Sequence, residues 1–258
     1  MKLDYFDLLN PCGVYLTEVG QIKSPKLIDI ARVGIRQYQY GLSLLLMGPK
    51  EFLEMLAKQT GGENVWDTLT EEEQGTLNIF ALMTMTDVTR DALQDAMQLF
   101  FEKELTWNEK KKCYLVGAQE KDGKIQVDGM IDEKNYAVIS DLCLQLAYIQ
   151  SEKPETLKFK NERSRKFYER FQKKKEAAKK AQKSNPDYEL ANIISALAAA
   201  HNSLNLLNIW NLTVYQVHDA FQRQQLKNMT DIRSHNYAVW GGDDFKPEIW
   251  FHRMDKEE

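Results

Sequence analysis

The sequence is short of the residues that mark loop-rich and disulfide-bonded proteins. Its 258 residues include 13 glycines and 6 prolines, a content that disfavours an all-β chain with many turns and favours helices. The three cysteines (Cys12, Cys113 and Cys143) are odd in number, far apart and without a CxxC pair. This pattern excludes a disulfide scaffold and a cysteine-based zinc site, and it suggests a reducing compartment.

Signals of export, membrane insertion and common cofactor chemistry are missing as well. The chain opens with MKLDYFDLL, which has acidic residues where a signal peptide has basic ones. No apolar run approaches the roughly 18 residues needed to span a bilayer. GxSxG, Walker A and GxGxxG motifs are absent. We therefore expect no membrane attachment, no cofactor and no enzymatic activity.

Positive charge is concentrated in one segment. Residues 153–183 contain 13 Lys or Arg and four Glu, which gives the segment a net charge of +9. The rest of the chain must then carry −13, because the total is −4. Charges of one sign at this density repel one another, so we expect a helix that is either solvated or turned toward a partner.

Apolar periodicity predicts helices along the first part of the chain. A serine–proline pair predicts a helix over about 25–47, and a glycine–proline pair ends it and begins another that stops at Gly61. A Thr-x-x-Glu capping box then predicts a third helix over about 71–104, with a kink near 85–89.

One stretch alone has the composition of strands. Residues 113–117 and 125–128 flank a polar turn with an Asp-Gly pair, which predicts a short β-hairpin. Because an isolated hairpin is marginally stable, we expect the helix predicted over 132–149 to cover it.

The carboxy-terminal part predicts two further helices. The first begins after Asn185 and carries an apolar stripe, and the second begins at a capping box at Thr213 and runs to about 233. The final residues predict an extended tail with aromatic side chains.

Together these elements predict a mainly α fold of helical lobes, with one small β-hairpin, joined by a basic helix. We expect an amino-terminal helical domain with the hairpin over 1–152 and a basic connecting helix over 153–184. The remaining region, 185–258, should be helical and end in the aromatic tail.

The histidines do not predict a metal site. His201, His218, His235 and His252 are 17 residues apart, which on a helix is about 4.7 turns and ~25 Å. The spacing therefore separates them, and we interpret it as coincidence. Carboxylates near the later histidines could complete a metal-dependent hydrolase site. We rank that reading last, because acidic residues are common in turns.

Four phrases span most of the chain. They are YFDLLNPCGVYLTEVGQIKSPKLIDIARVGIRQYQYGLSLLLMGPKEF, GKIQVDGMIDEKNYAVISDLCLQLAYI, FKNERSRKFYERF and NLTVYQVHDAFQRQQLKNMTDIRSHNYAVWGG. Together they resemble proteins from the tail gene clusters of phages and prophages of low-GC Gram-positive bacteria. The resemblance implies a tail assembly chaperone-like protein in the host cytoplasm. Such a factor would bind the tape-measure and tail-tube proteins during tail morphogenesis and would be non-enzymatic.

Partner contacts are expected on the basic segment and in the aromatic tail, where apolar side chains could cover a helical seam of a partner. The candidate residues are Phe167, Phe171, Lys173, Lys174, Lys175, Trp240 and Trp250. An alternative for the two tryptophans is that they anchor the tail on its own lobe.

Other functions stay open. The basic segment could bind nucleic acid through phosphate contacts, although its four Glu and the lack of a groove-reading motif disfavour this. A structural tail or head-completion protein of the virion would carry similar phrases. Self-association is also left open.

Overall fold

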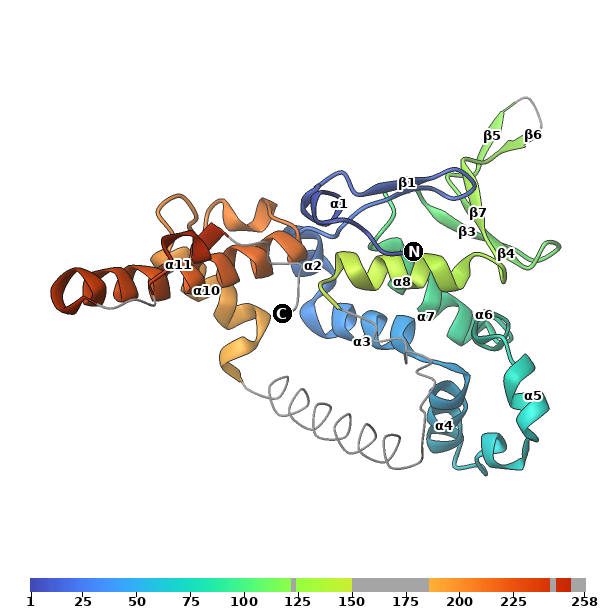
Figure 1. Ribbon diagram of the computed structural model, residues 1–258. Coiled ribbons are helices and arrows are strands. Elements are labelled where there is room, and N and C mark those ends of the chain that lie inside the picture. Colours follow the sequence, from blue (N-terminus) through green and yellow to red (C-terminus); the bar gives the residue numbers. More distant parts are fainter. Residues whose placement is uncertain (122–123, 150–185, 242–244, 252–258) are drawn as a thin grey trace. The chain divides into compact units, whose positions relative to one another are not determined.

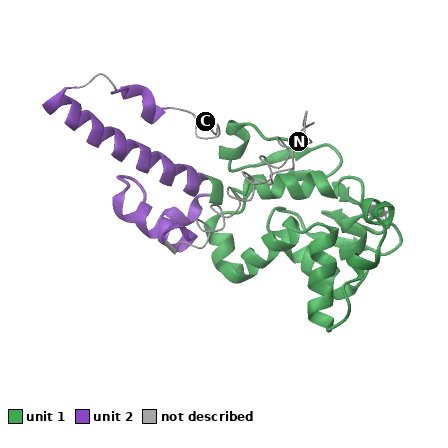
Figure 2. Cartoon of the chain, turned by 60° about the horizontal axis from the view of Figure 1, so that its bottom comes forward, with its two compact units in different colours: residues 1–151, 213–215 green, residues 152–212, 216–258 purple. Residues whose placement is uncertain are grey.

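The computed structural model describes residues 1–121, 124–149, 186–241 and 245–251 (Figure 1). Helices dominate these residues, so the predicted mainly α class is confirmed. The chain divides into two compact units, with 1–151 and 213–215 in unit 1 and 152–212 and 216–258 in unit 2 (Figure 2). The predicted basic connecting helix lies outside the described residues, and the three-region division stays a prediction.

Two helices replace the single one predicted over 25–47. They are α2 (Leu27–Val33) and α3 (Ile35–Leu46), preceded in the chain by the short helix α1 (Tyr5–Leu9). Gly34 separates α2 from α3 with a φ of 97°, a conformation that an L residue rarely adopts. The prediction was wrong here because apolar spacing continues through a glycine that turns the backbone.

The next segment is also more divided than predicted. Helix α4 (Pro49–Thr60) ends at Gly61 as expected. The 3₁₀ helix η1 (Val65–Thr68) follows α4. The single helix predicted over 71–104 is wrong, because the chain there forms α5 (Glu71–Thr76), α6 (Ile79–Met83) and α7 (Asp87–Gln98). The break between α6 and α7 lies close to the kink predicted near 85–89. Asn78 and Thr86 begin α6 and α7, since their side-chain oxygens accept hydrogen bonds from amides of the first turn.

Strands are more numerous than the one predicted hairpin. They are β1 (Val14–Leu16), β2 (Gly20–Ile22), β3 (Leu105–Asn108), β4 (Cys113–Val116), β5 (Gln119–Lys121), β6 (Lys124–Gln126) and β7 (Gly129–Ile131). β1 pairs with β2, β5 pairs with β6, and β4 lies between β3 and β7, always antiparallel. The expected pairing of 113–117 with 125–128 is therefore wrong, because the β5–β6 ribbon is inserted between β4 and β7.

Unit 1 has a contiguous core between this sheet and its helices. Helix α8 (Tyr136–Leu146) lies within the helix predicted over 132–149 and buries Ile139, Leu142 and Leu146. It packs on α3, which in turn packs on α7. An aromatic cluster joins the layers: the ring of Phe80 lies 5.2 Å from that of Tyr136 and 6.0 Å from that of Tyr114. Such ring pairs stabilise the fold beyond the apolar area that they bury.

Unit 2 contains the carboxy-terminal helices. Its described elements are η2 (Pro186–Tyr188), α10 (Leu190–Ala200), η3 (Ile209–Asn211), most of α11 (Val214–Trp240) and η4 (Pro247–Phe251). α11 is seven residues longer than the predicted end near 233, because nothing in that part of the sequence breaks a helix. The tail is not extended over Pro247–Phe251, where it forms a 3₁₀ helix.

Candidate docking surface

The predicted contact residues fall into two groups. Phe167, Phe171, Lys173, Lys174 and Lys175 lie outside the described residues. The two tryptophans of the tail region are described: Trp240 is the last residue of α11 and is 84% exposed, and Trp250 lies in η4 and is 49% exposed.

The returning tail is held on α11 by other groups than the tryptophan rings. The ring of Phe245 stacks on that of Tyr237 with a centroid distance of 5.4 Å. The Arg223 guanidinium donates a hydrogen bond of 3.0 Å to the carbonyl oxygen of Trp250. These two contacts hold the described part of the tail at Phe245 and at Trp250, and the ring of Trp240 is exposed and available for another contact.

A loop after α10 presents two leucines to solvent. Leu206 is 60% exposed and Leu207 is 91% exposed, although burying either side chain would be favourable by about 1.5–3 kcal/mol. Both leucines precede η3, at the tip of a segment that runs from 201 to 212. Side chains this exposed and this apolar are typical of contact surfaces.

Hydrogen bonds fix the shape of this loop. Nδ1 of His201 accepts hydrogen bonds from the amides of Ser203 and Leu204. The Asn208 side chain donates a hydrogen bond of 2.8 Å to the Ser203 carbonyl oxygen. At the tip, Oδ1 of Asn205 accepts a hydrogen bond of 2.9 Å from the Leu207 amide. The leucines are therefore held in place by backbone-directed hydrogen bonds, and a partner would not have to order them.

The Trp210 side chain adds a further hydrogen bond, from Nε1 to the Leu206 carbonyl at 2.9 Å. His201 is the residue that ends α10, and it organises the loop through its ring nitrogen.

The histidines that the structure describes form no metal site with other ligands. Among residues 1–121, 124–149, 186–241 and 245–251, no group of three or more His, Cys, Asp or Glu side chains could hold a metal ion. Burial lowers the pKa of His218 to about 4, so this ring is neutral at neutral pH. His235 Nδ1 lies 2.7 Å from the carbonyl oxygen of Asp231 in its own helix.

The cysteines are free thiols, of which Cys12 is exposed and the other two are buried. Burial raises the pKa of the Cys143 thiol well above its usual range, which makes it a packing residue and not a nucleophile.

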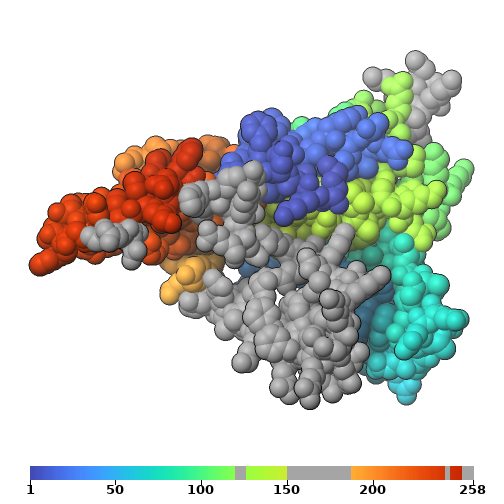
Figure 3. All heavy atoms as spheres, in the orientation of Figure 1, coloured from blue at the N-terminus to red at the C-terminus, as the bar shows by residue number. Residues whose placement is uncertain are grey.

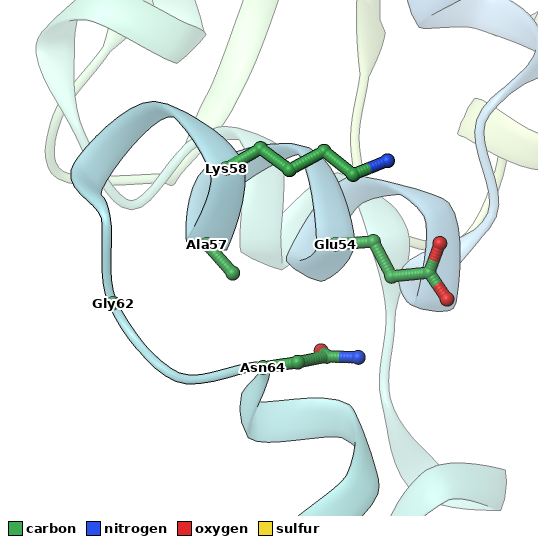
Figure 4. Close-up of a pocket in the computed structure, with 5 residues that line it drawn as sticks. All are labelled: Glu54, Ala57, Lys58, Gly62 and Asn64. Atoms are coloured by element: carbon green, nitrogen blue, oxygen red, sulfur yellow. The ribbon is translucent and has the colours of Figure 1, made fainter.

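A depression beside α4 offers little chemistry. It has a volume of about 300 Å³ and is lined by Glu54, Ala57, Lys58, Gly62 and Asn64 (Figure 4). Figure 4 shows the Glu54 and Lys58 side chains leaving α4 separately, with Asn64 across the gap from Ala57. The lining residues include no pair of a nucleophile and a base, so we assign no reaction to this site.

The comparison with known families points to the same end of the chain as the exposed leucines. A family model described as the YomV second domain matches residues 178–255, just under a third of the chain. This family is of a phage or prophage type. The match supports a phage-related protein. No curated protein and no solved structure matches the chain.

The matched segment contains residues that the sequence analysis did not single out. Leu206 and Leu207 were missed, as were the exposed apolar residues Met229, Ile232 and Val239 of α11. An apolar pair inside an asparagine-rich segment is the signal that could have identified the loop. For the described residues, no helix combines the length and the apolar character that a membrane span requires.

Proposed function

We propose that this phage-related protein is a tail assembly factor that acts by protein–protein contact, without catalysis, in the host cytoplasm. Its partners in this proposal are the tape-measure protein and the tail-tube protein. The resemblance of the four phrases to tail-cluster proteins and the match of residues 178–255 to a phage-type family both support this.

The observation that carries the proposal is the fixed leucine pair at 206 and 207. A tape-measure protein is a long helical chain with apolar seams, and such a seam needs apolar cover before the tail tube surrounds it. Two leucines on a loop braced by hydrogen bonds can enter such a seam with little loss of conformational entropy. The pair therefore suits transient binding to a helical partner.

The test is co-expression with the tape-measure protein of the same gene cluster. We expect the tape-measure protein to become soluble and to co-purify with this chain. The double variant Leu206→Asp/Leu207→Asp should lose that complex. A matched control is Met85→Asp/Val88→Asp, which places the same charges on a similarly exposed apolar pair just before and in the first turn of α7 in unit 1.

Two results would contradict the proposal. One is a tape-measure protein that stays insoluble in the presence of this chain. The other is an equal loss of the complex in the control variant. A chain that instead elutes with nucleic acid would favour the phosphate-binding alternative for residues 153–183, and the variant Lys173→Gln/Lys174→Gln/Lys175→Gln should then reduce that binding.

A further inference from the structure

The second half of α11 carries an exposed apolar stripe. Met229, Ile232 and Val239 are 51%, 62% and 68% exposed. In a heptad register they occupy the a and d positions of one heptad and the d position of the next. Asn236, also exposed, occupies the a position between Ile232 and Val239. This part of α11 forms the tip of unit 2 in the space-filling view (Figure 3).

A different side of the same helix carries other contacts. Tyr237 stacks on Phe245 of the returning tail, and Thr230 is buried, with its hydroxyl donating 2.8 Å to the Leu226 carbonyl. The tail therefore covers one face of α11, and the stripe from Met229 to Val239 is a second face.

Asn236 indicates what covers this stripe. An amide side chain both donates and accepts hydrogen bonds, so two copies of Asn236 can satisfy each other across a helix pair. An entirely apolar partner would leave the amide buried without a hydrogen bond, at a cost of about 1–3 kcal/mol. A single asparagine at an a position is also the device that sets register and oligomeric state in two-stranded coiled coils.

The flanking residues fit a parallel pair. The e and g positions from 228 to 240 are Asn228, Arg233, His235 and Trp240, and all four are exposed. Arg233 is the one fully charged side chain among them. In a parallel pair, Arg233 faces Asn228 of the second copy, and the two arginines lie on opposite sides of the seam. In an antiparallel pair, Asn236 would meet Ile232 or Val239 and lose its hydrogen bonds.

We propose that a second copy of this chain covers the stripe, and that residues 229–240 of α11 form a parallel two-stranded coiled coil with Asn236 paired across it. This self-association is independent of the leucine loop and of the tape-measure complex.

The first test is the mass of the full chain in solution, by light scattering and sedimentation over a range of concentrations. We expect a dimer, twice the chain mass of 30.0 kDa. Ile232→Asp should reduce the mass to one chain and leave the circular dichroism of the folded protein intact. Leu207→Asp, an equivalent change in the exposed loop, should remain dimeric. A monomer at every concentration, or a dimer that survives Ile232→Asp, would overturn the proposal.

The second test reads the direction of the helices. In a Cys12→Ser background, which removes the exposed thiol, Asn236→Cys should form a disulfide-linked dimer on mild oxidation, because equivalent a positions face each other. Lys227→Cys, on the far side of α11, is the control and should not be cross-linked in this way. A dimer in which the two variants cross-link equally would overturn the parallel arrangement.

Discussion

Unit 1 and unit 2 place their largest apolar side chains differently. In unit 1 the rings of Phe80, Tyr114 and Tyr136 are buried together, and they connect two helices to the sheet. In unit 2 the exposed set includes Leu207, Trp240 and Phe251, each mostly in solvent. Since apolar burial is the main source of folding free energy, unit 1 has the composition of a scaffold. Among the described residues, unit 2 leaves a larger share of its large apolar side chains exposed, a property typical of contact surfaces.

The largest expected effect tests this contrast with one substitution in each unit. Phe80→Ala should lower the free energy of unfolding by about 3–5 kcal/mol, because it leaves a cavity among three aromatic neighbours. Phe251→Ala, in an exposed ring of η4, should change it by less than about 0.5 kcal/mol. Denaturant unfolding of both variants measures the two values. Equal losses would contradict the division into scaffold and contact surface.

A partly buried histidine makes unit 2 sensitive to acid. The pKa of His218 is about 4 in the folded protein, against an ordinary value of 6.5, so the unfolded chain takes up the proton first. The stabilisation by the neutral ring is complete above about pH 6.5 and is lost as the pH falls toward 4, by up to about 3 kcal/mol.

The variant His218→Gln isolates this effect from the titration of carboxylates. Between pH 7 and pH 5, the denaturant midpoint of the natural chain should fall further than that of the variant. The same fall in both proteins would show that His218 does not control the acid response.

The next largest effect on stability is expected at Gly129 in unit 1, where two backbone segments lie close together. A Cβ on Gly129 would lie 2.5 Å from the carbonyl carbon of Val19, where the amide of Met130 donates 2.9 Å to the Glu18 carbonyl. Gly129→Ala should therefore force β7 away from this loop and cost about 1–3 kcal/mol.

Gly75 provides the matched control in helix α5. An added methyl there meets open space, so Gly75→Ala should stabilise the protein by about 0.5–1 kcal/mol. Thermal unfolding of the two variants should shift in opposite directions. A shift of the same sign in both would show that the contact at Gly129 is not tight.

The sequence predicted some elements of the fold well, and the reasons for its errors are local. Helix α4 was predicted because local residues mark its ends: Pro49 at its start and Gly61 at its end. Helix α8 was predicted because its apolar residues continue without interruption along one side of the helix. The strand β7 was missed because its partner β4 is separated from it by the β5–β6 ribbon, and such pairing leaves little trace in single-chain periodicity. The strand β3 was missed because its residues were assigned to the segment directly after the helix predicted over 71–104, although β3 pairs with the next strand along the chain.

The candidate surface was predicted only in part. Trp240 and Trp250 were selected for their aromatic character, and both are exposed. Leu206 and Leu207 follow no helical or strand period, and their exposure results from hydrogen bonds of His201, Asn205 and Asn208 that are local to a loop. From the sequence alone, a leucine is expected in the core of the protein. Its exposure in a loop can be recognised only when the backbone conformation around it is known.

The smallest effect concerns a hydrogen bond that serves the scaffold unit alone. The hydroxyl of Ser140 in α8 donates a hydrogen bond of 2.7 Å to the carbonyl oxygen of Leu45, near the end of α3. The residue four positions after Leu45 is Pro49, which has no N–H, so the helix cannot supply a donor to that carbonyl. Ser140→Ala should leave a buried acceptor unpaired and cost about 1 kcal/mol or slightly more.

Ser43→Ala is the control for this prediction. The Ser43 hydroxyl also donates 2.7 Å to a carbonyl of α3, that of Tyr40, but this carbonyl lies inside the helix, where an amide one turn later already serves it. The control should be within about 0.5 kcal/mol of the natural chain. A loss in Ser140→Ala no greater than in Ser43→Ala would mean that the end of α3 does not need the bond. The packing of α8 on α3 would then rest on apolar contact alone.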